Sequence, residues 1–239
     1  MIRNMQVIDV PKVVTVHIDA FPDSFLTNLG RKVLTIIYKE FAQNGFAYVF
    51  VEEEENAGFL AGTFLSAKKF YRHLLRRYPF QLSLYLIEAV IRHPPLFMLL
   101  IKQANRIFIN GGKPSGKNYF INGYQGILDS NKKVAHILTV AVSPNYRRLG
   151  IATKLWTYVL QNLPPLNIDA IMCSVLAENE PANSLYIKKG YKIIARIPRP
   201  DGSDELKWLF YQRNHCSILE NGNVIWHPKE HDDINVHAN

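Results

Sequence analysis

The sequence predicts an α+β protein in which layers of helix cover a mixed sheet. Two observations support this prediction. Residues 46–65 hold two runs of β-forming residues joined at Asn56-Ala57-Gly58, which is the pattern of an antiparallel hairpin. From residue 134 onward, strand-like and helix-like runs alternate. At 239 residues and 48% hydrophobic the chain can bury one substantial core, so we expect one domain over residues 1–213, followed by a hairpin and tail at 214–239.

The first half of the chain is predicted to begin with a strand and two helices. A short strand near residues 2–7 leads into an apolar-periodic helix over about 10–20. Asp23 or Ser24 can cap the second helix, because apolar residues recur at three- and four-residue steps over 26–41. The hairpin FAYVFVEEEE and GFLAGTFL follows an Asn-Gly pair that ends this helix.

The second half is predicted to alternate between strands and helices. Its elements are strand 134–142, helix 150–161, strand 170–177, helix 181–189, and the closing strands YKIIARIP and LKWLFYQR. In the C-terminal segment, SILENGNVIW is typical of a small hairpin around Asn221-Gly222.

Composition excludes several classes of protein. Cys173 and Cys216 are too few and too far apart for a disulfide framework or a zinc cluster, so we expect no metal. The N-terminus lacks the layout of a signal peptide, and no apolar run reaches the roughly 18 residues that span a bilayer. We therefore expect a cytoplasmic protein.

The positive charge is concentrated in one segment. The net charge is +8, and residues 66–106 contribute eight basic residues against one acid, Glu88, which is 8 − 1 = +7. Such a patch indicates an anionic ligand or surface. No nucleic-acid-binding motif accompanies it, so we expect no nucleic-acid partner.

Residues 142–160, VSPNYRRLGIATKLWTYVL, place two arginines and a glycine between a strand and a helix. The unpaired N–H groups at a helix start bind anions, with about 0.3–1 kcal/mol from the helix dipole and about 1.5–3 kcal/mol from each charge-assisted hydrogen bond. Gly150 and Ala152 leave room for an anion at the backbone, and Arg147 and Arg148 add positive charge. An ordinary loop with solvated arginines stays open as the alternative for this stretch alone.

Two stretches of the chain resemble the signatures of the GNAT superfamily of N-acetyltransferases. Arg147-x-x-Gly150-x-Ala152 is similar to its acetyl-coenzyme A (acetyl-CoA) signature, Gln/Arg-x-x-Gly-x-Gly/Ala. Some 27 residues later, Asn179-x-x-Ala182-x-x-x-Tyr186-x-x-x-Gly190-Tyr191 is similar to the second signature, Asn-x-x-Ala-x-x-x-Tyr-x-x-x-Gly-Phe. The resemblance covers residues 120–213 well and 1–65 loosely.

The resemblance implies a mostly antiparallel sheet, flanked by helices and splayed between its fourth and fifth strands. It implies acetyl-CoA as cofactor and transfer of the acetyl group to a primary amine. Pantetheine would bind along the edge of the fourth strand, and the pyrophosphate would bind the amides at the helix start. The implied cofactor-binding residues are Leu138, Val140, Val142, Arg147, Arg148, Leu149, Gly150, Ile151, Ala152, Thr153, Asn179 and Ala182.

The resemblance also implies catalytic residues. Tyr186 would protonate the leaving thiolate as general acid; a core tyrosine is the alternative. Family members often carry a glutamate where this chain has His136, and an imidazole with a pKa of about 6.5 can deprotonate an acceptor amine directly or through water. Alternation along strand 134–142 predicts that His136 shares a face with Leu138, Val140 and Val142. A buried core histidine, or an acceptor that needs no base, remains open.

Acceptor specificity is expected in two places. The loop after the first helix offers four candidate residues, for which a simple helix-breaking connection is the alternative: His17, Phe21, Asp23 and Ser24. Residues 66–119 form a predicted helical insert before the fourth strand, where a GNAT core would need only a few residues. Its basic and apolar helices would cover the acceptor cleft as a lid, form a homodimer face, or lie on a membrane through 66–106.

The layout of the chain is similar to that of GNAT proteins encoded with surface-glycan enzymes. This likeness implies an amino-sugar acceptor that is anionic or nucleotide-linked. An acetyltransferase acting on a protein or peptide amine, and a CoA-binding or membrane-surface module without turnover, stay open as alternatives. The histidine at 136 keeps the module open, whereas Tyr186 and Asn179 favour the enzyme.

Overall fold

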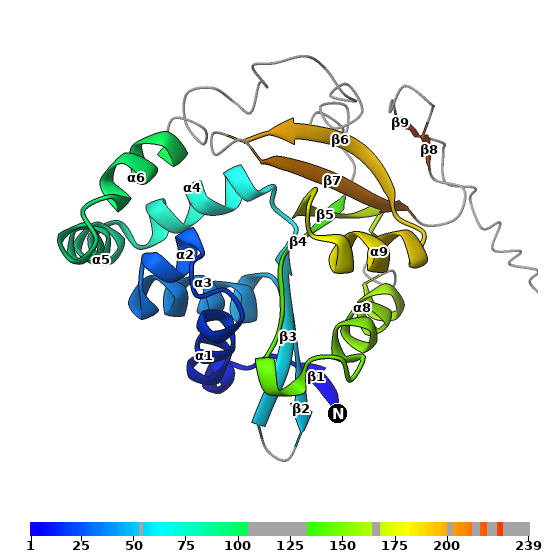
Figure 1. The fold of residues 1–239 in the computed structure, drawn as a ribbon, viewed down its shortest axis with the longest axis horizontal. Helices are drawn as coiled ribbons and strands as arrows, with labels where there is room; N and C mark the ends of the chain where they lie inside the picture. The colour runs from blue at the N-terminus through cyan, green and yellow to red at the C-terminus, as the bar shows by residue number, and fades with distance from the viewer. Residues whose placement is uncertain are drawn as a thin grey trace, which may run out of the picture.

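The computed structural model describes residues 1–52, 55–104, 133–163, 168–199, 203–211, 216–218 and 224–226. A seven-stranded sheet of order β1-β2-β3-β4-β5-β7-β6 runs through it, with helices on both faces (Figure 1). Every neighbouring pair in this sheet is antiparallel except β4 and β5, which are parallel. The predicted α+β class with a mixed, mostly antiparallel sheet is therefore confirmed.

The elements follow the predicted order, but the predicted hairpin turn at residues 56–58 was wrong: these residues lie inside a strand, where Gly58 pairs with Phe50. The strands are β1 (Ile2–Asn4), β2 (Phe46–Glu52), β3 (Glu55–Thr63), β4 (Val134–Val142), β5 (Ala170–Leu176), β6 (Lys192–Pro198) and β7 (Asp204–Tyr211). The α-helices are α1 (Val10–Ala20), α2 (Phe25–Asn28), α3 (Arg31–Asn44), α4 (Ala67–Arg77), α5 (Pro79–Arg92), α6 (Leu96–Ala104), α8 (Ile151–Asn162) and α9 (Glu180–Lys188). A separate hairpin joins β8 (Cys216–Ile218) to β9 (Val224–Trp226), while its turn and the tail 227–239 lie outside the described residues.

One helix of the expected set is interrupted. The apolar periodicity of residues 26–41 runs through two helices, α2 and α3, rather than one. Gly30 lies between them with φ of 91°, a conformation that an L-residue rarely adopts and that no continuous helix contains. Ser24 caps α2, since its Oγ accepts a hydrogen bond from the amide of Thr27 at 3.1 Å.

The sheet separates two apolar cores. One lies between the sheet and α1, α3 and α4, and the other between the sheet and α8 and α9. Phe59 and Leu60 are adjacent on β3 and fully buried, yet they belong to opposite cores, because successive strand side chains point to opposite faces. Trp156 of α8 is the largest fully buried side chain on its side.

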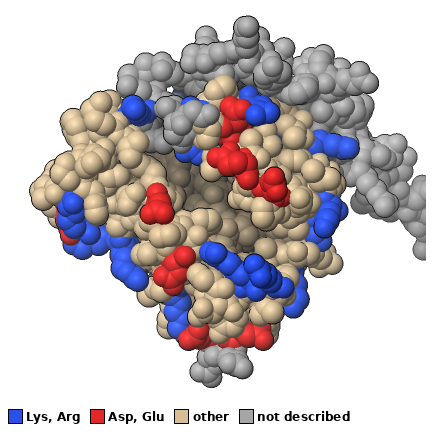
Figure 2. All heavy atoms as spheres, in the orientation of Figure 1, with Lys and Arg blue, Asp and Glu red and all other residues tan. Residues whose placement is uncertain are grey.

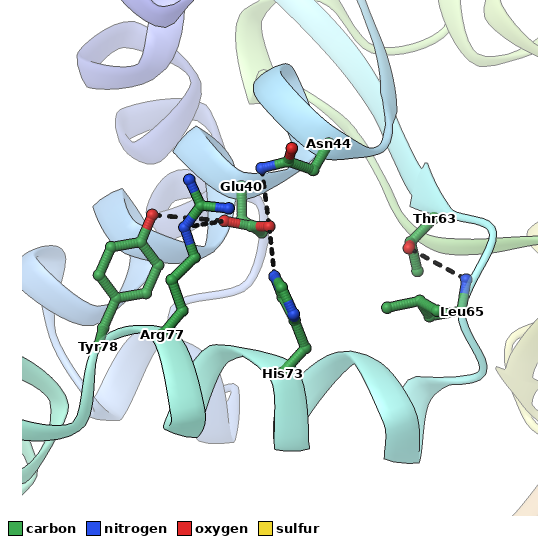
Figure 3. Close-up of polar contacts among 7 residues, drawn as sticks. All are labelled: Glu40, Asn44, Thr63, Leu65, His73, Arg77 and Tyr78. Atoms are coloured by element: carbon green, nitrogen blue, oxygen red, sulfur yellow. Dashed lines mark hydrogen bonds and ion pairs between the residues drawn. The ribbon is translucent and has the colours of Figure 1, made fainter.

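Helix α4, the first of the insert, is anchored to α3 by a buried carboxylate (Figure 3). The carboxylate belongs to Glu40, which is only 1% exposed. Its oxygens lie 2.8 Å from His73 Nε2 and 3.3 Å from the Tyr78 hydroxyl, and accept a bond from Asn44 Nδ2 at 2.9 Å. Arg77 adds an ion pair at 3.7 Å. Because several groups satisfy one buried charge, we expect this contact to fix α4 in place.

Candidate active site

Strands β4 and β5 diverge halfway along their length. Their paired residues run from Val134 with Ala170 to Ile137 with Cys173, while β4 stays paired with β3 as far as Val142. The edge of residues 138–142 that faces β5 thus has main-chain groups that β5 does not pair with. Figure 2 shows a hollow in this face of the molecule, between α4 and α9 in the orientation of Figure 1. An extended ligand could pair with the open edge as an added strand would.

The connection from β4 to α8 exposes backbone at the end of this open edge. Gly150 is the N-cap of α8 with φ of 72°, and Arg148 also has a positive φ, of 66°. A Cβ placed on Gly150 would meet no atom within 4 Å, so the space beside the helix start is open. Figure 2 shows basic side chains below the hollow and acidic ones above it and along its left side. Open amides at a helix start, next to positive charge, fit the pyrophosphate of CoA.

The implied cofactor residues at the helix start differ in what they offer. Arg147, Arg148 and Leu149 are exposed, whereas Ile151 is 3% exposed and packs in the core on the α8 side. Ile151 could therefore contact a ligand through its backbone only. Arg147 also reaches the carbonyl oxygens of Val142 and Ala20, each at 3.5 Å.

A bulge in β4 corrects the predicted position of His136. The pairing of β3 with β4 shifts between Ala61 and Gly62, and this shift leaves Leu138 as an extra residue of β4. Val140 and Val142 pack in the core on the α8 side, whereas Leu138 packs on the side of α1 and α3. The neighbours of His136 on both sides, Ala135 and Ile137, also belong to the α8-side core. His136 therefore points to the opposite face from Val140 and Val142, and the prediction of one shared face was wrong.

His136 is uncharged at neutral pH. It is 7% exposed, and burial, together with the charges of Lys207 and Lys69, lowers the pKa of its imidazole to about 4. A base with this pKa is about six units weaker than an amine of pKa 10.4, so it takes a proton from an ammonium group poorly. Because the imidazole is neutral, it does not repel the ammonium group of an acceptor.

A polar group that the sequence analysis missed lies on the same face of the sheet. Lys207 of β7 is 8% exposed and pairs across the ladder with Ser174 of β5. Its Nζ donates to Ser174 Oγ and to Glu205 Oε1, each at 2.7 Å. Burial, and next the charge of Glu205, raises the pKa of Tyr71 in α4 to about 12. Lys207, Ser174 and Glu205 thus form a polar wall beside the point where β4 and β5 diverge.

The hydroxyl of Tyr186 lies on the other face at that same point. Tyr186 is 6% exposed and lies close to Cys173, the last β5 residue that pairs with β4. Its ring lies 5.1 Å from that of Trp156 and 5.7 Å from that of Trp208. Burial, and next the proximity of Cys173, holds the pKa of Tyr186 well above its usual range. The phenol therefore keeps its proton, as a general acid must.

The second signature supports this part of the site through α9. Asn179 caps the helix, since its Oδ1 accepts from the amide of Ala182 at 3.2 Å, and its exposed side chain keeps an Nδ2 group for donation. Asn183, which sequence reasoning missed, donates to the carbonyls of Leu176 and Ala177 and accepts from Trp208 Nε1 at 3.1 Å. It holds α9 against the end of β5 and the middle of β7.

The four candidate acceptor residues are not brought together as one surface. His17 is 2% exposed and lies 2.6 Å from the hydroxyl of Tyr38, so it is part of the core. Phe21 is half-buried with its ring 5.3 Å from that of His17, and Ser24 serves as a helix cap. Asp23 is the exposed member of the set. Among the described residues, no group of three or more His, Cys, Asp or Glu side chains is placed to hold a metal ion.

Comparisons with known proteins agree with this geometry. A sequence model of the acetyltransferase (GNAT) family matches residues 12–191. No curated protein matches the chain. A GNAT-family acetyltransferase from Bacillus cereus is similar in structure with a TM-score of 0.52 and 14% identity, over 89% of this chain and 96% of that one.

Two further solved structures show the same fold. A putative phosphinothricin N-acetyltransferase has a TM-score of 0.53 and 13% identity, over 88% of this chain and 97% of that one. A chain of the NatC complex, solved with Gag peptide and CoA, has a TM-score of 0.50 and 13% identity, over 89% and 98%. Since the family match spans well over half of its length, the chain belongs to the GNAT family of N-acetyltransferases, whose cofactor is acetyl-CoA.

Proposed function

We propose that the protein transfers the acetyl group of acetyl-CoA to the primary amine of a small, hydroxylated molecule, with an amino sugar as the favoured acceptor. The observation that carries this proposal is the polar wall of Lys207, Ser174 and Glu205 beside the divergence of β4 and β5. Ammonium, hydroxyl and carboxylate groups in one wall suit an acceptor that presents several hydroxyls and one amine. The likeness of the chain layout to surface-glycan GNAT proteins supports the same acceptor class.

The chain offers two backbone surfaces for the cofactor, which supplies an acetyl group activated as a thioester. The open edge of residues 138–142 would hold the pantetheine arm, and the amides of 148–153 would hold the pyrophosphate. Asn179 would donate from Nδ2 to a pantetheine carbonyl, because its Oδ1 is engaged in capping α9. Gly150 keeps the approach to these amides open.

Tyr186 would act as the general acid. When the acceptor nitrogen forms its bond to the acetyl carbon, the carbon–sulfur bond breaks and the sulfur leaves with the bonding electrons. The Tyr186 hydroxyl, next to Cys173 at the divergence, would give its proton to that sulfur, and the acetylated nitrogen would lose a proton to water. The raised pKa of Tyr186 keeps the phenol protonated before the reaction and favours the return of a proton after turnover. Because it also makes the phenol a weaker acid, the proton would move only as negative charge builds up on the sulfur.

His136 is not proposed as the base, because burial lowers the pKa of its imidazole to about 4. The acceptor would react through the fraction of its amine that is already uncharged, which is larger for an amino sugar than for a lysine-like amine. The carboxylate of Glu205 would hold the acceptor amine or a hydroxyl, and Lys207 would hold an oxygen. Activity would then rise with pH as the acceptor amine loses its proton.

The test is release of free CoA thiol from acetyl-CoA with separate panels of amino sugars, nucleotide-linked amino sugars, polyamines, amino acids and peptides. The proposal expects turnover with an amino sugar at the highest kcat/KM. Turnover with peptides alone would refute the amino sugar as acceptor but would leave the proposed acetyl transfer standing. Measurable cofactor binding with no turnover on any panel would favour the non-catalytic module. Glu205→Gln and Lys207→Met should raise KM for the acceptor while leaving the affinity for CoA unchanged.

A further inference from the structure

Helices α5 and α6 present apolar side chains to solvent. On α5 the exposed fractions are 88% for Phe80, 63% for Leu84, 58% for Ile87 and 73% for Ile91, and on α6 they are 55% for Phe97, 58% for Met98 and 42% for Leu99. The four α5 residues recur at steps of four, three and four, so they form one stripe along the outer side of the helix. Contiguous apolar surface of this kind marks an interaction site.

This outer face is additional to the face that joins the insert to the protein. The inner side of the two helices is already buried, with Leu82 5%, Ala89 0% and Leu96 3% exposed. An ion pair between Lys32 of α3 and Glu88 of α5, at 2.9 Å, joins these two helices. The contacts of buried Glu40 with His73 and Arg77 join α3 to α4 (Figure 3). The insert is therefore already packed against the protein through its inner face. The outer apolar stripe takes no part in that packing.

The charge around this face indicates what covers it. Residues 66–104 carry seven basic side chains against Glu88 as the only acid, and that acid is paired with Lys32 and Arg92. Of these basic side chains, Arg76 and Lys102 are exposed. In Figure 2 the surface over α5 and α6, at the left, is mostly uncharged and basic side chains border it. A second copy of the chain would bring two such basic segments together, which like-charge repulsion opposes.

We propose that the outer face of α5 and α6 docks the protein on an anionic lipid surface. The apolar stripe would enter the boundary between headgroups and acyl chains, and the surrounding lysines and arginines would contact the lipid phosphates. Among the described residues, no helix is long and apolar enough to cross a membrane, so α5 and α6 would lie parallel to the surface. This inference rests on the insert alone and does not depend on the proposed acetyl transfer.

Co-sedimentation of the full chain with lipid vesicles tests the proposal. The protein should pellet with vesicles of phosphatidylcholine that contain roughly one third phosphatidylglycerol, and far less with phosphatidylcholine alone. The double variant Leu84→Gln/Ile91→Gln should lower the partition coefficient roughly 100-fold, because two apolar anchors are lost. The variant Arg76→Gln/Lys102→Gln should lower it about 25-fold, at about fivefold for each basic residue.

The matched control is Ile8→Gln, which removes an apolar side chain that is 81% exposed but lies outside the insert. It should bind vesicles as the unmodified protein does. All variants should keep their circular dichroism spectrum and their affinity for CoA. A protein that stays in the supernatant with anionic vesicles, that binds neutral vesicles equally well, or that binds unchanged after Leu84→Gln/Ile91→Gln overturns the proposal. So does a dimer in solution that this double variant dissociates, because a second copy would then be the occupant.

Discussion

The role proposed for Tyr186 depends on its hydroxyl alone, and Tyr186→Phe removes that group. The aromatic ring would keep its place among Trp156, Tyr191 and Trp208, with ring centroids 5.1, 5.6 and 5.7 Å away. The change deletes only the hydroxyl next to Cys173, so we expect the free energy of unfolding to change by about 1 kcal/mol or less. Loss of a general acid lowers turnover by about 100- to 10,000-fold.

Tyr191→Phe is the matched control for this substitution. Tyr191 belongs to the same cluster and is 3% exposed, but its hydroxyl has no hydrogen-bond partner. Removing an unsatisfied buried hydroxyl should leave kcat unchanged and raise the free energy of unfolding by up to about 1 kcal/mol. The two variants therefore differ in catalysis although both delete one phenol oxygen from one aromatic cluster.

The assay is initial-rate release of CoA thiol at saturating acetyl-CoA, with the cofactor affinity of each variant measured by calorimetry. The account expects kcat to fall for Tyr186→Phe at an unchanged dissociation constant for CoA. Equal kcat values for the original protein and Tyr186→Phe would refute the general-acid role. Equal losses of activity in both tyrosine variants would show that packing of the cluster, and not proton transfer, had been disturbed.

Three more results follow from the same structure. Gly150→Val forces a β-branched residue into φ of 72° and narrows the approach to the helix start, so calorimetry should show at least about tenfold weaker CoA binding; unchanged affinity would contradict the phosphate site. Glu40→Leu removes the carboxylate that His73 and Arg77 of α4 share. Because these two side chains are 40% and 45% exposed and regain water, the free energy of unfolding in urea should fall by about 1 kcal/mol, whereas an unchanged midpoint would contradict the anchoring of α4. The pKa values of His17 and His136 are both lowered from 6.5 to about 4, so between these pH values the unfolded chain binds more protons than the folded one. The free energy of unfolding should therefore be full above about pH 6.5 and fall as the pH drops toward 4. His136→Gln should make this fall with pH less steep, as measured by urea unfolding at several pH values.

Much of the fold follows from local pattern. The β2–β3 hairpin is predictable because two runs of β-forming residues follow each other, although the predicted turn was misplaced: Gly58 lies inside β3 and pairs with Phe50. Helix α8 is predictable because a glycine precedes apolar residues at helical spacing. The exposed backbone at the start of α8, which we propose binds phosphate, was predictable for the same reason, since Gly150 and the arginines before it lie in one short stretch. The break at Gly30 was missed because the apolar periodicity continues on both sides of it.

What the sequence could not show depends on contacts between distant segments. The bulge at Leu138 adds one residue to a strand that is apolar on both faces, so alternation gave no sign that the faces exchange. Lys207 meets Ser174 only because β7 inserts between β5 and β6 in the sheet. Glu40 could have been found, since it falls on the apolar side of α3 between Ile37 and Phe41.

The central claim is that the open edge of β4 and the first turn of α8 bind the cofactor through their backbone. A crystal structure with CoA measures this directly. The account predicts pantetheine paired along residues 138–142, the pyrophosphate within hydrogen-bonding distance of the amides of 148–153, and the sulfur close to Tyr186. Phosphates bound to side chains away from α8, or a β4 edge closed by β5, would contradict it.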